Sequence, residues 1–357
     1  MRILYIAGEA ANWVVNLCNE FCRKGHEVVC VVQQLDEYDS ENPVPEHENL
    51  TRVNVDHDVM FSPYDLKKEL SERGLFNSSY DLLFGAHAPN APALSEFSEE
   101  LGVPWGVMVL DILTDLFTVQ PHRRIQWSYW LSKMSTAKQV VFNTFIARDE
   151  YERFTGVFYP DTNVVTYATN VPKKHHMSGS LIRGDYVVSA CRLTNVKNVS
   201  MITKALASLG APIKQVVIGR DRGDLNNILT IAREGNIEVT HKSLVSEEEK
   251  LSLIKNSLCL VYPQRTPYLA GLSPWESMMI GKPTICPDYK VSRDLYKDYV
   301  DYFNPNSVNS LALKIYNIFD NEYDLKRLEE ASEYASVEAS FDTMSDGLLR
   351  IMKSIKG

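Results

Sequence analysis

Two cationic side chains stand five residues apart in the segment 189–198. This segment connects an apolar run to a predicted helix. Arg192 and Lys197 would lie where a strand ends and that helix begins. Arginine can bind phosphate oxygens through two N–H groups, and lysine adds a point charge. The start of a helix contributes unpaired backbone N–H groups and the positive end of the helix dipole. The spacing therefore suits a diphosphate, and two surface cations on an ordinary loop are the alternative.

A second segment, 261–286, predicts a strand, a loop with a glycine, a helix, a tight turn and another strand. Gly271 lets a ligand approach the backbone closely, and the N–H groups near Leu272 and Ser273 would point from the start of the helix. Glu276 on that helix can accept hydrogen bonds from both hydroxyls of a ribose. Together, the two segments indicate a ligand that contains a diphosphate and a ribose.

The composition restricts the class of protein in which these residues act. A chain of 357 residues suffices for two domains of roughly 100–200 residues each. Its 45% hydrophobic and 23% charged residues are typical of a globular protein with large cores, and exclude disorder and a small disulfide scaffold. The formal net charge of −9, without a long basic block, argues against nucleic acid as a partner.

The cysteines and the apolar runs indicate the compartment. All six cysteines fall in apolar segments or on an apolar helix face, which is typical of buried, reduced thiols. The chain opens on a strand pattern without a secretory leader, and no apolar run approaches the roughly 18–20 residues that a bilayer requires. We therefore expect a cytoplasmic protein, in solution or at the cytoplasmic face of a membrane.

Short apolar runs alternate with helical patterns along the whole chain. The runs at 3–7 and 27–32 are apolar throughout, which indicates parallel strands buried on both faces. A polar, aperiodic segment at 172–184 is interpreted as a solvated linker. We predict an α/β protein of two doubly wound domains, with a ligand bound in the cleft between them. Further strands are predicted at 81–84, 105–110, 139–142 and 163–166, and then at 186–190, 215–218, 238–240, 258–262 and 283–286.

These motifs resemble those of the GT-B glycosyltransferases, in particular the retaining family 4 (glycosyl transferases group 1), which uses nucleotide-sugar donors. Arg192 and Lys197 match the Arg–x4–Lys pair that holds the donor diphosphate in that family. Glu276 matches the second glutamate of its Glu–x7–Glu motif, whose residues hold the sugar and the ribose. Gly281 and Pro283 match the turn that follows.

The resemblance covers nearly the whole chain. The run that ends at Gly219 resembles a strand beside the nucleotide, and the run that ends at His87 resembles a strand whose histidine faces the cleft. The final helix resembles one that crosses back to the first domain. The resemblance therefore implies the GT-B fold, with a Rossmann-like acceptor domain at 1–171, a linker at 172–184, a Rossmann-like donor domain at 185–337, and a C-terminal helix at 338–357 that packs on the first domain.

One departure from the family concerns the donor sugar. Tyr268 stands eight residues before Glu276, where the family usually has the glutamate that contacts the sugar, and no acid occurs between Pro263 and Trp275. Either the donor sugar is unusual, or the loop is built differently, or the protein binds without turnover. The residues expected to bind the donor are Gly219, Tyr268, Gly271, Leu272, Ser273 and Glu276.

Candidates for the acceptor side lie in the first domain. Glu9 follows the single glycine Gly8 where many relatives have two, and would bind an acceptor hydroxyl or cap the next helix. His87 would orient the acceptor or the phosphate, or be a satisfied core histidine. Asp111 would contact the acceptor nucleophile or cap a helix, and Asn143 at the end of its strand is a weaker candidate of the same kind.

Two other motifs have competing interpretations. Asp56-His57-Asp58 has the Asp–x–Asp pattern of the metal site in the other large glycosyltransferase fold, but it lies far in sequence from the donor motifs. We interpret it as a loop and predict a reaction without a metal ion. The basic, aromatic segment 121–133, with Trp127 and Trp130, would lie on an anionic membrane surface and deliver a lipid-linked acceptor, or form a packed helix of the first domain.

The resemblance implies transfer of a sugar from a nucleoside diphosphate sugar, of the UDP or GDP type, to a hydroxyl acceptor with retention at the anomeric carbon. The acceptor would be a glycan, a lipid-linked molecule or a small molecule, and no cofactor is expected. Arg192 and Lys197 would be the catalytic residues, since they would stabilise charge on the leaving diphosphate in place of a metal ion. A nucleotide-sugar epimerase of the same fold and a pseudoenzyme that binds a nucleotide or sugar are the alternatives. The sequence has no signal for the oligomeric state.

Overall fold

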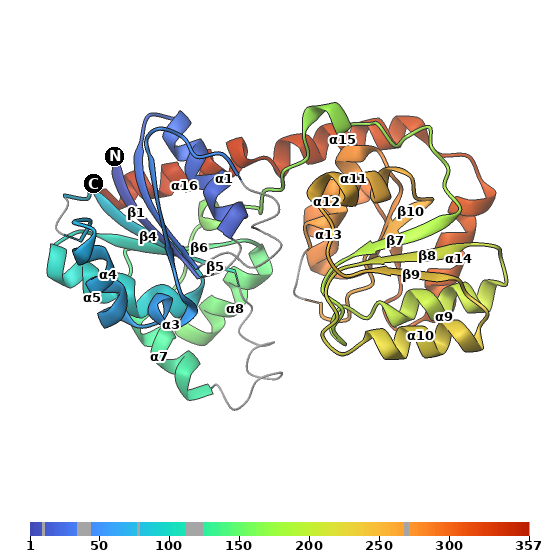
Figure 1. The fold of residues 1–357 in the computed structure, drawn as a ribbon, viewed down its shortest axis with the longest axis horizontal. Helices are drawn as coiled ribbons and strands as arrows, with labels where there is room; N and C mark the ends of the chain where they lie inside the picture. The colour runs from blue at the N-terminus through green and yellow to red at the C-terminus, as the bar shows by residue number, and fades with distance from the viewer. Residues whose placement is uncertain (9–10, 34–43, 77–78, 111–123, 268–270, 357) are drawn as a thin grey trace. The chain divides into compact units, whose positions relative to one another are not determined.

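The computed structural model describes residues 1–8, 11–33, 44–76, 79–110, 124–267 and 271–356 (Figure 1). The chain divides into two compact units. The first consists of Met1–Tyr167 together with Phe341–Gly357, and the second consists of Ala168–Ser340. None of the described helices is both long and apolar enough to cross a bilayer.

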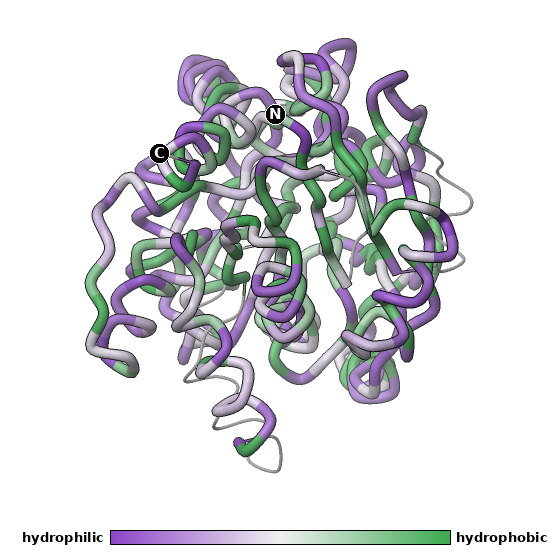
Figure 2. The backbone as a smooth tube through the Cα atoms, turned by 90° about the vertical axis from the view of Figure 1, so that its left-hand side faces the viewer, coloured by the Kyte–Doolittle hydropathy of each residue, from purple (hydrophilic) through white to green (hydrophobic). Residues whose placement is uncertain are grey.

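The first unit contains a six-stranded parallel sheet with the strand order β3-β2-β1-β4-β5-β6. Its central strands are buried on both faces. In Figure 2 the segments with hydrophobic residues are concentrated in the interior. This is the doubly wound arrangement that the apolar runs predict. The strands are β1 (Arg2–Ala7), β2 (Glu27–Gln33), β3 (Leu50–Val55), β4 (Leu82–Ala86), β5 (Trp105–Val109) and β6 (Gln139–Phe142).

Helices cover both faces of this sheet (Figure 1). The last helix, α16 (Phe341–Lys356), packs against α1 (Ala11–Arg23) and against β4, β5 and β6, so the C-terminal helix belongs to the first unit as the resemblance implies. Its apolar stripe, which includes Met344, Leu348 and Met352, is buried. The other helices of this unit are α3 (His57–Met60), α4 (Pro63–Glu72), α5 (Ala91–Leu101), α7 (Arg124–Met134) and α8 (Phe145–Thr155), with short 3-10 turns at η1 (Ala88–Asn90) and η3 (Asp161–Asn163).

The strand predicted at 163–166 does not form. Asn163 ends the 3-10 turn η3, and Val164 makes only an isolated bridge to Phe142. The Asn163 amide donates to the Val140 carbonyl and to Gln139 Oε1, so the side chain serves as a polar anchor at the edge of the sheet.

The second unit contains a second six-stranded parallel sheet, with the order β12-β11-β10-β7-β8-β9. Successive side chains of a strand point to opposite faces, so Val187 and Val188 enter two different hydrophobic cores. The strands are β7 (Tyr186–Ala190), β8 (Lys214–Ile218), β9 (Val239–Lys242), β10 (Cys259–Val261), β11 (Thr284–Pro287) and β12 (Asp301–Phe303).

The helices of the second unit form two layers (Figure 1). One core lies under α9 (Ser200–Leu209), α10 (Leu225–Glu234) and α14 (Val308–Asp320). The other lies under α11 (Glu247–Lys255), α12 (Ser273–Ile280), α13 (Lys290–Tyr296) and α15 (Leu325–Glu338). Two 3-10 turns, η4 (Lys173–His175) and η5 (Lys297–Tyr299), complete the unit.

The segment 172–184, expected to be a solvated linker, packs within the second unit. The Met177 N–H donates to the Met279 carbonyl, and the Gly179 N–H donates to the Ile280 carbonyl. Lys282 is buried, and its ammonium donates to the carbonyls of Gly179 and Ile182. The buried Lys282 ammonium therefore attaches the segment 172–184 to the second unit. The polar composition of the segment did not predict this attachment.

The buried lysine predicts a pH dependence of stability. Burial lowers the pKa of Lys282 to about 8, whereas an unfolded chain titrates its lysines near 10.4. At a pH between these two pKa values, Lys282 holds more protons in the unfolded chain than in the folded protein. Its contribution to the free energy of unfolding therefore rises with pH. We expect the difference in unfolding free energy between the unmodified protein and Lys282→Met to grow by about 2 kcal/mol between pH 7 and pH 9.5.

Urea denaturation of both proteins at the two pH values measures this effect. Other titrating groups are common to both proteins and cancel in the comparison. Lys282→Arg keeps a charge at both pH values, so the unmodified protein should gain stability relative to this variant as well. Parallel pH profiles of the unmodified protein and both variants would contradict the expectation.

Candidate functional site

The loop that follows β7 contains both predicted catalytic cations. Arg192 is exposed, and its guanidinium makes no hydrogen bond or ion pair with any residue that the structure describes. Lys197 lies further along the loop, with Nζ 2.8 Å from Gln264 Oε1 and 3.2 Å from the Tyr262 hydroxyl. The ammonium also lies 5.3 Å from the centre of the Tyr262 ring. One cation is therefore available to a ligand, and the other is held in place by the loop after β10.

Arg265 joins these two loops and was not identified from the sequence. Its guanidinium donates to Asn195 Oδ1 at 2.8 Å and to Asn198 Oδ1 at 3.0 Å, and its backbone N–H donates to the Val196 carbonyl. Asn198 has a positive φ of 53°, a conformation that asparagine tolerates better than most residues. Asn195 and Val196 lie between Arg192 and Lys197, and Asn198 directly follows Lys197, so Arg265 holds the backbone that carries both cations.

Gly219 follows β8 and lies against the loop after β7. Its φ is 134°, and a Cβ atom there would lie 2.1 Å from the Cys191 carbonyl oxygen. The Gly219 carbonyl accepts a hydrogen bond from His241 Nε2 at 2.8 Å. A glycine is thus required for the backbone beside Arg192 to pack, in addition to any approach by a ligand.

Cys191, next to Arg192, is the nearest candidate for a nucleophile by position. Burial raises the pKa of Cys191 to about 11, and the neighbouring cations Lys197 and Arg192 only partly oppose this effect. A thiol with so high a pKa stays protonated at neutral pH and is a weak nucleophile.

The loop before α12 contributes the third part of the site. Gly271 is packed so closely that a Cβ atom would lie 2.6 Å from the Tyr262 ring. Its N–H donates to the Tyr296 hydroxyl at 3.2 Å, so this amide already has a partner. Leu272 is the N-cap residue of α12, and Ser273 begins the helix and is buried. Of the backbone groups proposed from the sequence, the N–H groups of Leu272 and Ser273 have no acceptor among the described residues.

Glu276 is buried on α12, with 5% of its surface exposed. Its Oε1 accepts hydrogen bonds from Lys250 Nζ at 3.0 Å and from the Thr169 hydroxyl at 2.9 Å. Within the described part of the chain, Oε2 has no hydrogen-bond partner. The carboxylate predicted to bind a ribose is therefore already paired through one oxygen.

These residues converge because of the sheet order. Strands β10, β7 and β8 are parallel neighbours, so the loops after them lie along one edge. Tyr262 contacts both Lys197 and Gly271, and Gly219 lies against Cys191 beside Arg192. Tyr268, the residue in the place of the missing glutamate, lies outside the described residues.

In the first unit, three acceptor candidates lie at the carboxyl ends of parallel strands of one sheet: the neighbours β1 and β4, and the edge strand β6. Gly8 follows β1 beside the Phe61 ring, and a Cβ atom there would lie 2.6 Å from it. His87 follows β4 with a φ of 71°, and its N–H donates to the Met108 carbonyl. Asn143 follows β6, is buried, and leaves Oδ1 without a partner among the described residues. The other two candidates, Glu9 and Asp111, lie outside the residues that the structure describes.

The aromatic segment forms helix α7 where it is described, from Arg124 onward. Trp127 and Trp130 are buried and pack edge to face with ring centres 4.8 Å apart. Ile125 and Tyr129 are exposed instead. The tryptophans therefore belong to the core of the first unit, and any contact of this helix with a membrane would use its other face.

The Asp56-His57-Asp58 motif lies at the start of α3. All three side chains are exposed, and His57 Nδ1 lies 3.3 Å from Asp58 Oδ1. Across the described ranges, no group of three or more His, Cys, Asp or Glu side chains is arranged to hold a metal ion.

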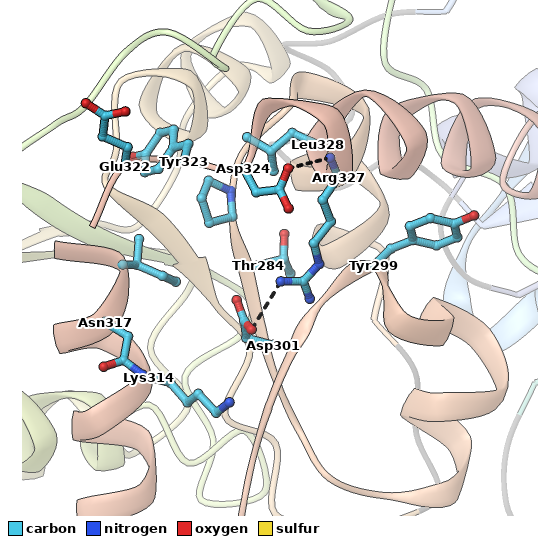
Figure 3. A pocket seen from close by; sticks show the side chains of 12 residues that line it. Thr284, Tyr299, Asp301, Lys314, Asn317, Glu322, Tyr323, Asp324, Arg327 and Leu328 are labelled. Atoms are coloured by element: carbon cyan, nitrogen blue, oxygen red, sulfur yellow. Dashed lines mark hydrogen bonds and ion pairs between the residues drawn. The ribbon is translucent and has the colours of Figure 1, made fainter. Parts of the chain in front are cut away.

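A cavity of about 190 Å³ lies elsewhere in the second unit (Figure 3). Thr284 and Asp301, which begin β11 and β12, line it, so it lies at the amino ends of the strands. Arg327 donates to Asp301 Oδ1 at 3.3 Å, and Asp324 accepts from the Arg327 backbone N–H. The Arg327 guanidinium thus pairs with Asp301, Asp324 caps the Arg327 backbone N–H, and the cavity is separate from the edge that carries Arg192.

The comparisons with known proteins agree with this geometry. Residues 174–336 match the family described as Glycosyl transferases group 1. The comparison with curated proteins gives no match.

Solved structures match the fold over nearly the whole chain. Sucrose-phosphate synthase from Thermosynechococcus elongatus has a TM-score of 0.79 at 14% identity, with 99% of this chain and 98% of that chain covered. HepE from Anabaena, in complex with UDP and glucose, has a TM-score of 0.74 at 12% identity, with 99% and 100% covered. A UDP-forming α,α-trehalose-phosphate synthase from Burkholderia xenovorans has a TM-score of 0.73 at 13% identity, with 100% and 99% covered. Residues 174–336 thus resemble the group 1 glycosyl transferases, and the two Rossmann-like units have the GT-B fold of the matching structures.

Proposed function

We propose that the protein transfers a sugar from a nucleoside diphosphate sugar to a hydroxyl acceptor, with retention at the anomeric carbon and without a metal ion. The observation that carries this proposal is the exposed Arg192, which has no side-chain partner among the described residues. It lies on the same short loop as Lys197, which Tyr262 and Gln264 hold. Two cations and the start of α12 on one edge of a parallel sheet suit a diphosphate. The neighbours whose structures contain UDP or that are described as UDP-forming favour a UDP-type donor over a GDP-type donor.

The proposed reaction breaks the bond between the anomeric carbon and the β-phosphate oxygen. The acceptor oxygen forms the new bond on the same face, and its proton passes to the leaving phosphate. Negative charge grows on the diphosphate in this step, and Arg192 and Lys197 would stabilise it. Glu276 would hold the ribose through Oε2 and keep the donor in register. The acceptor would bind near Gly8, His87 and Asn143, together with Glu9 and Asp111.

A second candidate function is nucleotide binding without turnover. It is favoured by Tyr268, which replaces the acid that contacts the donor sugar in the family that this chain resembles. Transfer activity of the unmodified protein with any donor would speak against this candidate.

A thermal-shift panel tests the proposal at its first step. It uses UDP, GDP, ADP and dTDP and their common sugar conjugates, with magnesium and with a chelator. A ligand at 100 times its dissociation constant stabilises the folded state by about 2.7 kcal/mol. We expect one nucleotide to raise the melting temperature equally with and without magnesium, and Arg192→Ala to abolish the shift.

Lys204 provides the control for this panel, because it is an exposed cation on α9 whose ammonium makes no hydrogen bond or ion pair with any described residue. Lys204→Ala should keep the shift. If no nucleotide stabilises the unmodified protein, the proposed function is wrong. If stabilisation requires magnesium or manganese, metal independence is wrong while the donor site stands.

A further inference from the structure

A partly buried charged cluster lies behind the proposed ribose-binding carboxylate. Lys250 on α11 reaches Glu276 on the adjacent helix α12, with Nζ 3.0 Å from Oε1 (Figure 1). The same ammonium contacts Glu247, with Nζ 3.0 Å from Oε1 and 2.8 Å from Oε2. The Thr169 hydroxyl donates to the same Glu276 oxygen at 2.9 Å, and its backbone N–H donates to the Ala339 carbonyl.

The charges of this cluster support one another. Burial lowers the pKa of Lys250, but the nearby carboxylates of Glu276 and Glu247 outweigh it and raise that pKa well above its ordinary value. Burial raises the pKa of Glu247, and Glu276 adds to this effect while Lys250 opposes it. Lys250 is therefore charged throughout the physiological pH range and is shared between two carboxylates.

The arrangement makes the two oxygens of Glu276 unequal. Each carboxylate oxygen has two lone-pair directions, and Oε1 already accepts two hydrogen bonds. In the described part of the chain, Oε2 accepts none. Because the side chain is buried and held by an ammonium, it cannot exchange the two oxygens without breaking an ion pair in a poorly solvated environment.

We propose that Lys250 is a positioning residue of the donor site: together with Thr169 it occupies Oε1 of Glu276, so that Oε2 is presented to the ribose hydroxyls of the donor nucleotide. This inference rests on the proposed function. It assigns to Lys250 a role that neither the Arg–x4–Lys motif nor the Glu–x7–Glu motif contains. It also predicts that Lys250 affects recognition of the ribose rather than of the diphosphate.

The test compares nucleotides that differ only in the ribose. Isothermal titration of the full chain gives the dissociation constants of UDP, 2′-deoxy-UDP and 3′-deoxy-UDP, with GDP and its deoxy analogues as the alternative series. We expect the unmodified protein to bind at least one deoxy analogue about tenfold or more weakly than the parent nucleotide, because a hydrogen bond to a carboxylate is lost. In Lys250→Met this ratio should fall to about twofold or less.

The control is Lys242→Met. Lys242 lies 2.7 Å from Glu249, another carboxylate of α11, but this ion pair is partly exposed and does not involve Glu276. Lys242→Met should keep the ratio of the unmodified protein, and Lys250→Arg should keep most of it because the charge remains. Thr169→Val removes only one neutral donor, so it should lower the ratio partially even if Lys250→Met fails to fold.

The outcomes separate the inference from the proposed function. If Lys250→Met weakens parent and deoxy nucleotides by the same factor, Lys250 has only a structural role and the inference is overturned. A ratio that stays unchanged in Lys250→Met and in Thr169→Val also overturns it, while the donor site stands. If the unmodified protein binds neither UDP nor GDP, the proposed function is wrong and the inference falls with it.

Discussion

Arg192→Ala should lower the rate of sugar transfer by about 10²–10³-fold, the usual effect of removing one group that stabilises charge in a transition state. Lys197→Ala should have an effect of the same order. Arg192 has no partner among the described residues, so its loss should leave the fold intact and act on the reaction. Lys197 contacts Tyr262 and Gln264, so its loss should also loosen the loop after β10.

Steady-state kinetics with saturating donor measures this prediction. A group that acts on the transition state lowers kcat and kcat/KM together, whereas loss of ground-state binding alone raises KM. Lys204→Ala is the matched control, since it removes an exposed cation from the following helix. Near-normal kcat in both Arg192→Ala and Lys197→Ala would exclude the assigned catalytic role.

Gly219→Ala should lower the free energy of unfolding by about 3 kcal/mol or more. Two effects add at this position. The φ of 134° is unfavourable for a residue with a side chain, and the new Cβ atom would lie 2.1 Å from the Cys191 carbonyl oxygen. The clash is with backbone, so relief would require the loop that carries Arg192 to move. We therefore also expect weaker nucleotide binding.

Gly223→Ala is the control that separates strain from clash. Gly223 lies in the same loop with a φ of 107°, but a Cβ atom there would meet nothing within 4 Å. This variant should cost only the conformational strain, about 1–2 kcal/mol, and should keep nucleotide affinity. Urea denaturation of the full-length variants measures both values, and equal losses in the two would mean that contact with Cys191 is unimportant.

Local patterns in the sequence predicted most of the elements. The continuous apolar runs became the parallel strands because strands buried on both faces need no polar alternation. Ser246 caps α11, since the Glu249 N–H donates to the Ser246 hydroxyl, and a serine three residues before a glutamate favours this contact. The prediction of a strand at 163–166 was wrong. The residues there favour a strand, but a strand also requires a paired neighbour, and Val164 makes only an isolated bridge.

The residues proposed to bind the donor were also named from the sequence, and their role in binding stays a prediction. The named residues all lie near strand ends or helix starts: Arg192, Lys197, Gly219, Gly271 and Glu276. Ligands of open parallel sheets bind at these places. Residue type and spacing suffice for this inference, because a strand end and a helix start are local features. The aromatic segment was less informative about burial. Its local sequence is compatible with an exposed or a buried Trp127, and the structure shows that Trp127 is buried.

The sequence by itself thus determined the fold class, the positions of most elements and which loops carry cations. Only the tertiary structure decided which side chains those residues meet. Lys250 reaches Glu276, Arg265 reaches Asn195 and Asn198, and Gly219 lies against Cys191 across separations that no local pattern encodes. The contact between Lys250 and Glu276 is energetically the most demanding of these, because the Glu276 carboxylate is buried and a charge removed from water has few ways to relax.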